Sequence, residues 1–319
     1  MSDSPSRHLV DPQLLPLLES FPPLRLSDGF LPVLRNAPSR LTVDPADVAR
    51  TDQTLRQVPG PHGSPPVGVV IYRPRGVIGT LPCIFHIHGG GYVVGAATGN
   101  EAQHRPMAAS LGCMIVSVDY RLAPETRFPG AIEDCYAALG WLFANAAALG
   151  VDEARIGVMG ESAGGGLAAA FALLARDRGE YALAFQHLIY PMIDDRTCAT
   201  AAPHPYTGEF IWSAQSNRFG WESLLGHPPG GEGVSPYAAA ARADDLTGLP
   251  PAFIATGALD LFLDENLAYA MRLTRAGAPV ELHVYPGAYH GFQWAVQADV
   301  TRQAARDSLA ALAKALAKP

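Results

Sequence analysis

The chain has 319 residues, of which 48% are hydrophobic and 17% are charged. This apolar content can build a sizeable core, which excludes a disordered or fibrous protein. The formal net charge of −7 at pH 7 repels a phosphate backbone, and no basic cluster compensates for it, so we expect no nucleic-acid partner. The length allows one large domain or two small ones.

Neither the cysteines nor the apolar segments point to a metal, a redox dithiol or a membrane. No two cysteines form a C-x-x-C pair. The first residues, MSDSPSRHLVDPQ, contain no apolar stretch of the secretory type, and the nearly uncharged segment 137–151 is too short to span a bilayer. We therefore expect a cytoplasmic protein with no membrane span and no cofactor. The four cysteines are Cys83, Cys113, Cys135 and Cys198.

The first fifty residues carry the signals of short helices. Asp11 precedes Pro12, and Asp44 precedes Pro45, an arrangement typical of a helix start. Ser27 marks a further start. Apolar residues fall on one face after the first of these starts, namely Leu14, Leu15, Leu18 and Phe21.

From about residue 52 short apolar runs alternate with helical stretches, which predicts an α/β fold with a largely parallel sheet. The predicted strands are Val67–Tyr72, Pro82–His88, Met114–Asp119, Ile156–Met159, Phe185–Tyr190, Ala252–Thr256 and Val280–Tyr285. The predicted helices are Gly130–Ala148, Gly164–Arg178, Asp264–Ala276 and Val300–Ala317. Two segments do not fit this alternation, the N-terminal stretch and the aromatic-rich stretch Thr197–Pro236, and the second is more typical of a lid than of a separate domain.

The segment Gly160-Glu161-Ser162-Ala163-Gly164 lies between a short apolar strand and an alanine-rich helix. G-x-S-x-G in this context is typical of a nucleophile elbow, in which glycines permit a tight turn that exposes a strained serine. The motif is short, and a serine at the start of a glycine-rich helix is an equally good explanation when it stands alone.

A second motif, His88-Gly89-Gly90-Gly91, follows a predicted strand and makes the catalytic interpretation stronger. Its bare N–H groups can donate to an oxyanion together with the N–H of Ala163. Neither the P-loop nor the G-x-G-x-x-G spacing is present, so phosphate or dinucleotide binding is not expected.

A serine nucleophile needs a base and an orienting carboxylate, and in this kind of fold they follow in the order Ser, acid, His. His290 and Asp260 each stand in a loop directly after a predicted strand, where sites of open α/β sheets gather. We therefore assign His290 as the base of Ser162 and Asp260 as the orienting carboxylate. Asp264 and Glu265 are better explained as a helix start. The remaining alternatives, which lack a matching position, are Glu161, His86, His104 and His283.

His86 and His88 alternate on one face of a strand, as two metal ligands could. No carboxylate is near them in sequence, so we expect no metal site. The simpler role for His88 is a hydrogen bond that shapes the glycine loop.

Together these motifs resemble the bacterial hormone-sensitive-lipase family of α/β-hydrolase esterases over nearly the whole chain. Asp119-Tyr-Arg-Leu-Ala-Pro-Glu125, Phe128-Pro129, Glu133-Asp134 and the Asp260–Glu265 segment carry further parts of the resemblance. It implies an eight-stranded, mostly parallel sheet flanked by helices, with a helical cap. The implied division is residues 1–50 and 197–236 for the cap and residues 51–196 and 237–319 for the core.

The resemblance also maps the oxyanion donors onto Gly90, Gly91 and Ala163, and it implies short acyl chains and a homodimer through the last strand. The chain departs from the usual family pattern at Glu161, Leu261 and Leu263, which bears on substrate preference. We predict a serine carboxylesterase that cleaves short- to medium-chain esters of small molecules. An amidase or peptidase on the same scaffold is the alternative, and a non-catalytic receptor is a weaker one, because His290 is present.

The predicted substrate pocket consists of residues beside the two motifs and aromatic residues of the predicted cap. Ordinary packing of the cap is an equally simple role for the aromatic residues. The pocket candidates are Tyr92, Glu161, Phe210, Trp212, Phe219 and Trp221.

Overall fold

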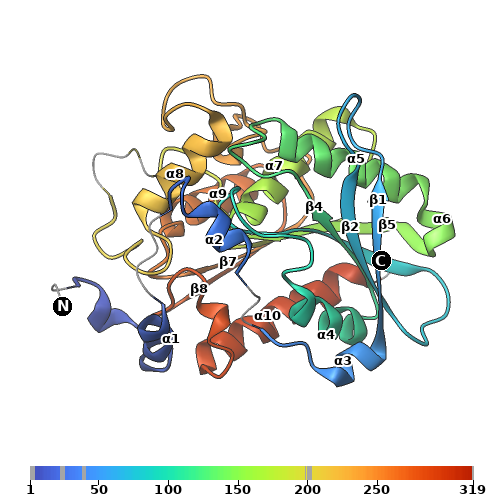
Figure 1. The fold of residues 1–319 in the computed structure, drawn as a ribbon, viewed down its shortest axis with the longest axis horizontal. Coiled ribbons are helices and arrows are strands. Elements are labelled where there is room, and N and C mark those ends of the chain that lie inside the picture. The colour runs from blue at the N-terminus through green and yellow to red at the C-terminus, as the bar shows by residue number, and fades with distance from the viewer. Residues whose placement is uncertain (1–3, 22–25, 38–40, 198, 200–202, 318–319) are drawn as a thin grey trace.

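The computed structural model describes residues 4–21, 26–37, 41–197, 199 and 203–317, and Cys198 lies outside these ranges. A sheet of eight strands in the order β1-β2-β4-β3-β5-β6-β7-β8 runs through the molecule (Figure 1). Antiparallel pairing is confined to β1 with β2 and β2 with β4, and the other neighbours are parallel. The strands are β1 (Thr51–Val58), β2 (Val67–Pro74), β3 (Leu81–Ile87), β4 (Met114–Asp119), β5 (Val151–Glu161), β6 (Gln186–Ile189), β7 (Ala252–Gly257) and β8 (Val280–Tyr285).

The predicted fold class is confirmed, and all seven predicted strands are present. The strand β1 was not predicted from the sequence. This edge strand buries only its two end residues, Thr51 and Val58, and its mostly polar middle is exposed apart from the half-buried Gln53. It therefore lacks the apolar run that marks the central strands, such as β3, in which every residue is buried.

Helices cover both faces of the sheet, as Figure 1 shows. On one face, α4 (Glu101–Leu111) packs against β2, and α10 (Asp299–Leu316) packs against β7 and α4. On the other face, α5 (Gly130–Ala144) and α7 (Ala163–Arg178) pack against each other and the sheet, and α9 (Leu263–Arg275) packs against β7 and β8. The stacked rings of Phe85 and Phe171 join β3 to α7, with centroids 5.5 Å apart. Every helix within the described ranges is too short or too polar to cross a lipid bilayer.

The N-terminal segment contains α1 (Leu15–Ser20), α2 (Leu31–Arg35) and α3 (Pro45–Arg50), which begin close to the predicted starts. The Asp11 and Asp44 carboxylates cap helical turns by accepting from the N–H groups of Gln13 and Ala46. The helix α3 packs against β1 and α4, so this part of the segment lies on the core.

The N-terminal segment also contacts the loop that follows β8. The Asp11 N–H donates to the Gly287 carbonyl at 3.1 Å, and the Tyr289 hydroxyl donates to the Leu14 carbonyl at 2.9 Å. The segment is thus held against the loop that carries His290.

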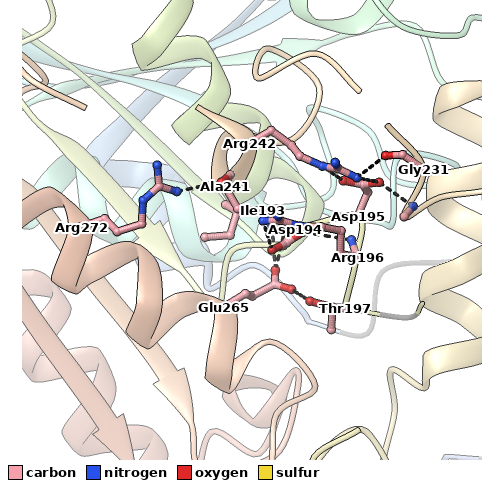
Figure 2. A network of polar contacts seen from close by, with 11 residues as sticks. Ile193, Asp194, Asp195, Arg196, Thr197, Gly231, Ala241, Arg242, Glu265 and Arg272 are labelled. Atoms are coloured by element: carbon pink, nitrogen blue, oxygen red, sulfur yellow. Dashed lines mark hydrogen bonds and ion pairs between the residues drawn. The ribbon is translucent and has the colours of Figure 1, made fainter. Parts of the chain in front are cut away.

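The predicted lid segment contains α8 (Ala214–Leu225). A polar network joins the beginning of this segment to its end (Figure 2). Asp195, just before the segment, accepts from the Gly230 N–H at 2.7 Å and from the guanidinium of Arg242 at 2.7 and 2.8 Å. Arg242 in turn donates to the Gly231 carbonyl at 2.8 Å. The fully buried Asp195 therefore connects the residues just before the lid segment to those at and just after its end.

Candidate functional site

Ser162 occupies a sharp turn between the end of β5 and the first residue of α7. Its backbone has φ 56° and ψ −123°, a conformation that an L-residue adopts only when its surroundings enforce it. A Cβ atom on Gly160 would stand 2.3 Å from the Gly164 carbonyl oxygen, and one on Gly164 would stand 2.1 Å from the Ile87 carbonyl oxygen. Both glycines are therefore required for the turn, as a nucleophile elbow demands.

A chain of hydrogen bonds joins Ser162 to His290 and Asp260. The Ser162 Oγ lies 2.9 Å from His290 Nε2, and His290 Nδ1 lies 2.8 Å from Asp260 Oδ2. Because a carboxylate only accepts, Nδ1 carries the proton and Nε2 is free to accept from the serine hydroxyl. The other oxygen of Asp260 accepts from the Phe262 N–H at 2.9 Å, which fixes the carboxylate.

The three side chains come from the carboxyl ends of three different strands. Ser162 follows β5, Asp260 follows β7 and His290 follows β8, where ligand sites of parallel sheets form. All three residues are buried, and Asp260 is fully so. Burial of this kind strengthens the electrostatic interactions between them.

The glycine loop follows β3 and lies against the elbow. The Tyr120 hydroxyl donates to the His88 carbonyl at 2.8 Å, and the two rings stack with centroids 4.2 Å apart. Within the described part of the chain, the N–H groups of Gly90, Gly91 and Ala163 donate to no protein acceptor. They are thus available to an oxyanion.

Comparison with known proteins agrees with this geometry. A family model described as the alpha/beta hydrolase fold matches residues 84–294. The chain belongs to this family. It is 36% identical over 313 residues to carboxylesterase NlhH of Mycobacterium tuberculosis, with 96% of each chain covered, and 34% identical to an arylesterase of Saccharolobus solfataricus over 66% of this chain and 67% of the relative.

Solved structures give the same result, and the resemblance to the hormone-sensitive-lipase family of esterases is confirmed. A bacterial heroin esterase superposes with a TM-score of 0.88 at 36% identity, with 98% of this chain and 99% of that chain covered. Esterase LipW from Mycobacterium marinum superposes with a TM-score of 0.84 at 30% identity, with 98% and 97% covered.

In this α/β-hydrolase, Trp212 is the pocket candidate whose ring stands near the histidine. Its ring centroid lies 6.1 Å from that of His290. It also covers Gly91, where a Cβ atom would come within 2.2 Å of the indole. A hydrogen bond of 3.2 Å from Nε1 to Asn217 Oδ1 fixes the ring. Trp212 therefore bridges the glycine loop and the histidine from the lid segment.

The other aromatic candidates have different surroundings. Tyr92 and Trp221 are fully buried and pack on each other with centroids 5.3 Å apart, and the Tyr92 hydroxyl donates to the Met192 carbonyl. Phe219 packs against the main core, and Phe210 lies 5.8 Å from the ring of Tyr289. For Tyr92 and Trp221 the contacts match the packing role considered in the sequence analysis.

The rejected alternatives for the base and acid are engaged with partners other than the serine–histidine pair. His86 pairs with Glu161, and His283 pairs with Glu281 on the edge strand β8. Glu265 is buried and accepts from the N–H of Ile193 at 2.7 Å, and burial raises its pKa well above the usual value. No cluster of three potential metal ligands occurs among the described residues.

Tyr190 stands beside the site and was not predicted from the sequence. Tyr190 directly follows β6, and its ring centroid lies 4.5 Å from that of His290. Its φ of 35° places it in the left-handed region, which is unusual for an aromatic residue. Its position at the carboxyl end of a strand is the feature of the sequence that could have indicated a place beside the site.

Proposed function

We propose that this chain is a serine carboxylesterase in which Ser162, His290 and Asp260 form the catalytic triad. The hydrogen-bond chain from Ser162 Oγ through His290 to Asp260 carries the proposal. The esterase relatives at 36% identity over most of the chain support it independently.

In the first half of the reaction Ser162 Oγ attacks the ester carbonyl while His290 Nε2 accepts its proton. The carbonyl oxygen becomes an oxyanion, which accepts hydrogen bonds from the N–H groups of Gly90, Gly91 and Ala163. When the tetrahedral intermediate collapses, the bond to the leaving alcohol breaks and His290 protonates that alcohol.

In the second half a water molecule attacks the acyl-enzyme, with His290 again accepting a proton. The same oxyanion donors stabilise the second tetrahedral intermediate. When it collapses, the bond between the acyl carbon and Ser162 Oγ breaks, His290 returns the proton to Ser162, and the carboxylic acid is released. Asp260 holds the Nδ1–H tautomer of His290 and stabilises the imidazolium that forms in each half.

We assign short- to medium-chain acyl esters as substrates. The indole of Trp212 stands beside both the histidine and the glycine loop, and we expect it to limit the room for a long acyl chain. A relative from Pseudomonas putida, 33% identical over 210 residues, is named an ethyl acetate hydrolase.

A panel of nitrophenyl esters from acetate to palmitate, with the nitroanilides of the same acids, tests the proposal. We expect kcat/KM to be highest for a short ester and the anilides to be poor substrates. Faster cleavage of the anilides would favour the amidase alternative, and a maximum at palmitate would indicate a lipase.

The homodimer, the cytoplasmic location and the division into cap and core stay predictions of the sequence. The proposed dimer strand, β8, is at the edge of the sheet, and its Leu282 and Val284 side chains are exposed. Light scattering of the wild-type protein and of Val284→Lys tests the dimer.

A further inference from the structure

A largely buried group of polar side chains lies between the glycine loop and the strands β3, β4 and β5. Its centre is the carboxylate of Glu161, which has a side-chain exposure of 21%. Oε1 accepts from the Gly89 N–H at 3.1 Å and from Asn100 Nδ2 at 2.8 Å. Oε2 accepts from His86 Nε2 at 2.9 Å, and His86 Nδ1 lies 2.9 Å from Ser117 Oγ.

This carboxylate is ionised at neutral pH. Burial disfavours its charge, but His86, Asn100 and the Gly89 N–H together outweigh burial and lower the pKa of Glu161 to about 2. Hydrogen bonds to an ionised acceptor are roughly twice as strong as neutral ones. The hydrogen bond from the Gly89 N–H to this carboxylate is therefore stronger than one to a neutral acceptor would be.

Glu161 connects the two halves of the oxyanion site through a single side chain. Its backbone is joined directly to Ser162, and its carboxylate holds Gly89, the residue next to the donor Gly90. The two segments also touch through their backbones, since a Cβ atom on Gly89 would stand 2.7 Å from the Glu161 carbonyl oxygen. A shift of the loop would thus move the donors relative to the serine.

We propose that Glu161 is a positioning residue that fixes the glycine loop against the nucleophile elbow and so sets where the oxyanion donors stand. The inference rests on the proposed esterase function. It differs from the pocket role considered in the sequence analysis, because the carboxylate is engaged by three donors of the protein itself.

The two substitutions Glu161→Gln and Glu161→Ala separate a positioning role from a merely structural one. A glutamine keeps an oxygen that can accept from Gly89, whereas alanine removes it. Loss of one oxyanion donor costs about 10²–10³ in kcat, and we expect a partial displacement of the loop to cost about 10- to 100-fold. Glu161→Gln should stay within about threefold of the wild type.

The decisive readout is inhibition by a trifluoromethyl ketone, which adds to the serine and places a negative oxygen in the oxyanion site. Glu161→Ala should lose affinity for this ketone by the same factor as it loses kcat, with KM nearly unchanged. Glu265→Ala is the matched control. This variant also removes a buried carboxyl group, but one that accepts from the Ile193 N–H and not from Gly89, so it should lower Tm without a selective loss of ketone affinity.

Unchanged ketone affinity in folded Glu161→Ala would overturn the inference, as would a loss in Glu161→Gln equal to that in Glu161→Ala. If the alanine variant does not fold, Glu161→Leu fills the space without an acceptor, and the same outcomes apply. Absence of ester hydrolysis by the wild type would instead contradict the proposed function.

Discussion

Replacing Trp212 by alanine should shift the acyl-chain preference of the enzyme toward longer esters. The indole covers Gly91 and stands 6.1 Å from the His290 ring, so we expect its removal to open space beside the nucleophile for a longer acyl chain. Each methylene group that enters an apolar space gains about 0.8 kcal/mol. Two further methylene groups therefore gain about 1.6 kcal/mol.

In kinetic terms this is a rise of about 15-fold in kcat/KM for the hexanoate ester relative to the butyrate ester. The assay is hydrolysis of the two nitrophenyl esters by the wild type and the variant, with the ratio of kcat/KM as the readout. The ratio cancels any change in the fraction of active enzyme. Because Trp212 is buried, the variant should also be less stable, by about 3–5 kcal/mol.

Trp221→Ala is the matched control, since it removes a second buried tryptophan of the same segment that packs on Tyr92. It should lower stability without changing the hexanoate-to-butyrate ratio. An unchanged ratio in Trp212→Ala, or an equal change in both variants, would refute the reasoning that Trp212 limits the acyl chain.

Three further predictions concern other parts of the structure. Asp260→Asn should lower kcat by about 10⁴ with little change in KM for a nitrophenyl ester, because His290 loses its Nδ1–H tautomer; a loss below tenfold would argue against Asp260 as the orienting acid. Arg242→Met leaves the fully buried Asp195 without its cation and should lower the free energy of unfolding by about 3–5 kcal/mol in urea titrations; an unchanged midpoint would contradict this. Burial lowers the pKa of His187 from 6.5 to about 3, so the unfolded state binds a proton that the folded state does not, and stability falls as the pH drops from 6.5 toward 3. Between pH 7 and pH 5 the wild type should lose about 2 kcal/mol more than His187→Gln does, and parallel losses would show that His187 does not titrate in this way.

The sequence was sufficient for the fold class because the central strands contain short apolar runs that alternate with helical stretches. It was insufficient at the edge of the sheet, where β1 pairs through its backbone and leaves residues such as Leu55 and Arg56 exposed. The helix α4 also escaped prediction. It carries Pro106 in its interior, which usually ends a helix, and buries the polar residues His104 and Arg105.

For the candidate site, short motifs and chain order were enough to select Ser162, Asp260 and His290, because each follows a strand at the same edge of the sheet. The contacts of Glu161 could not be found in this way. They join residues 61 to 75 positions apart, and only the parallel pairing of β3 with β5 places His86 beside Glu161. The position of Trp212 likewise depends on how the lid segment folds back over Gly91.

The turnover of nitrophenyl butyrate by Ser162→Ala tests the central claim most directly. The expected result is a fall in kcat of about 10⁵–10⁶ in a variant that keeps the Tm of the wild type to within a few degrees. Turnover close to that of the wild type would contradict the assignment of Ser162 as the nucleophile, and with it the proposed mechanism.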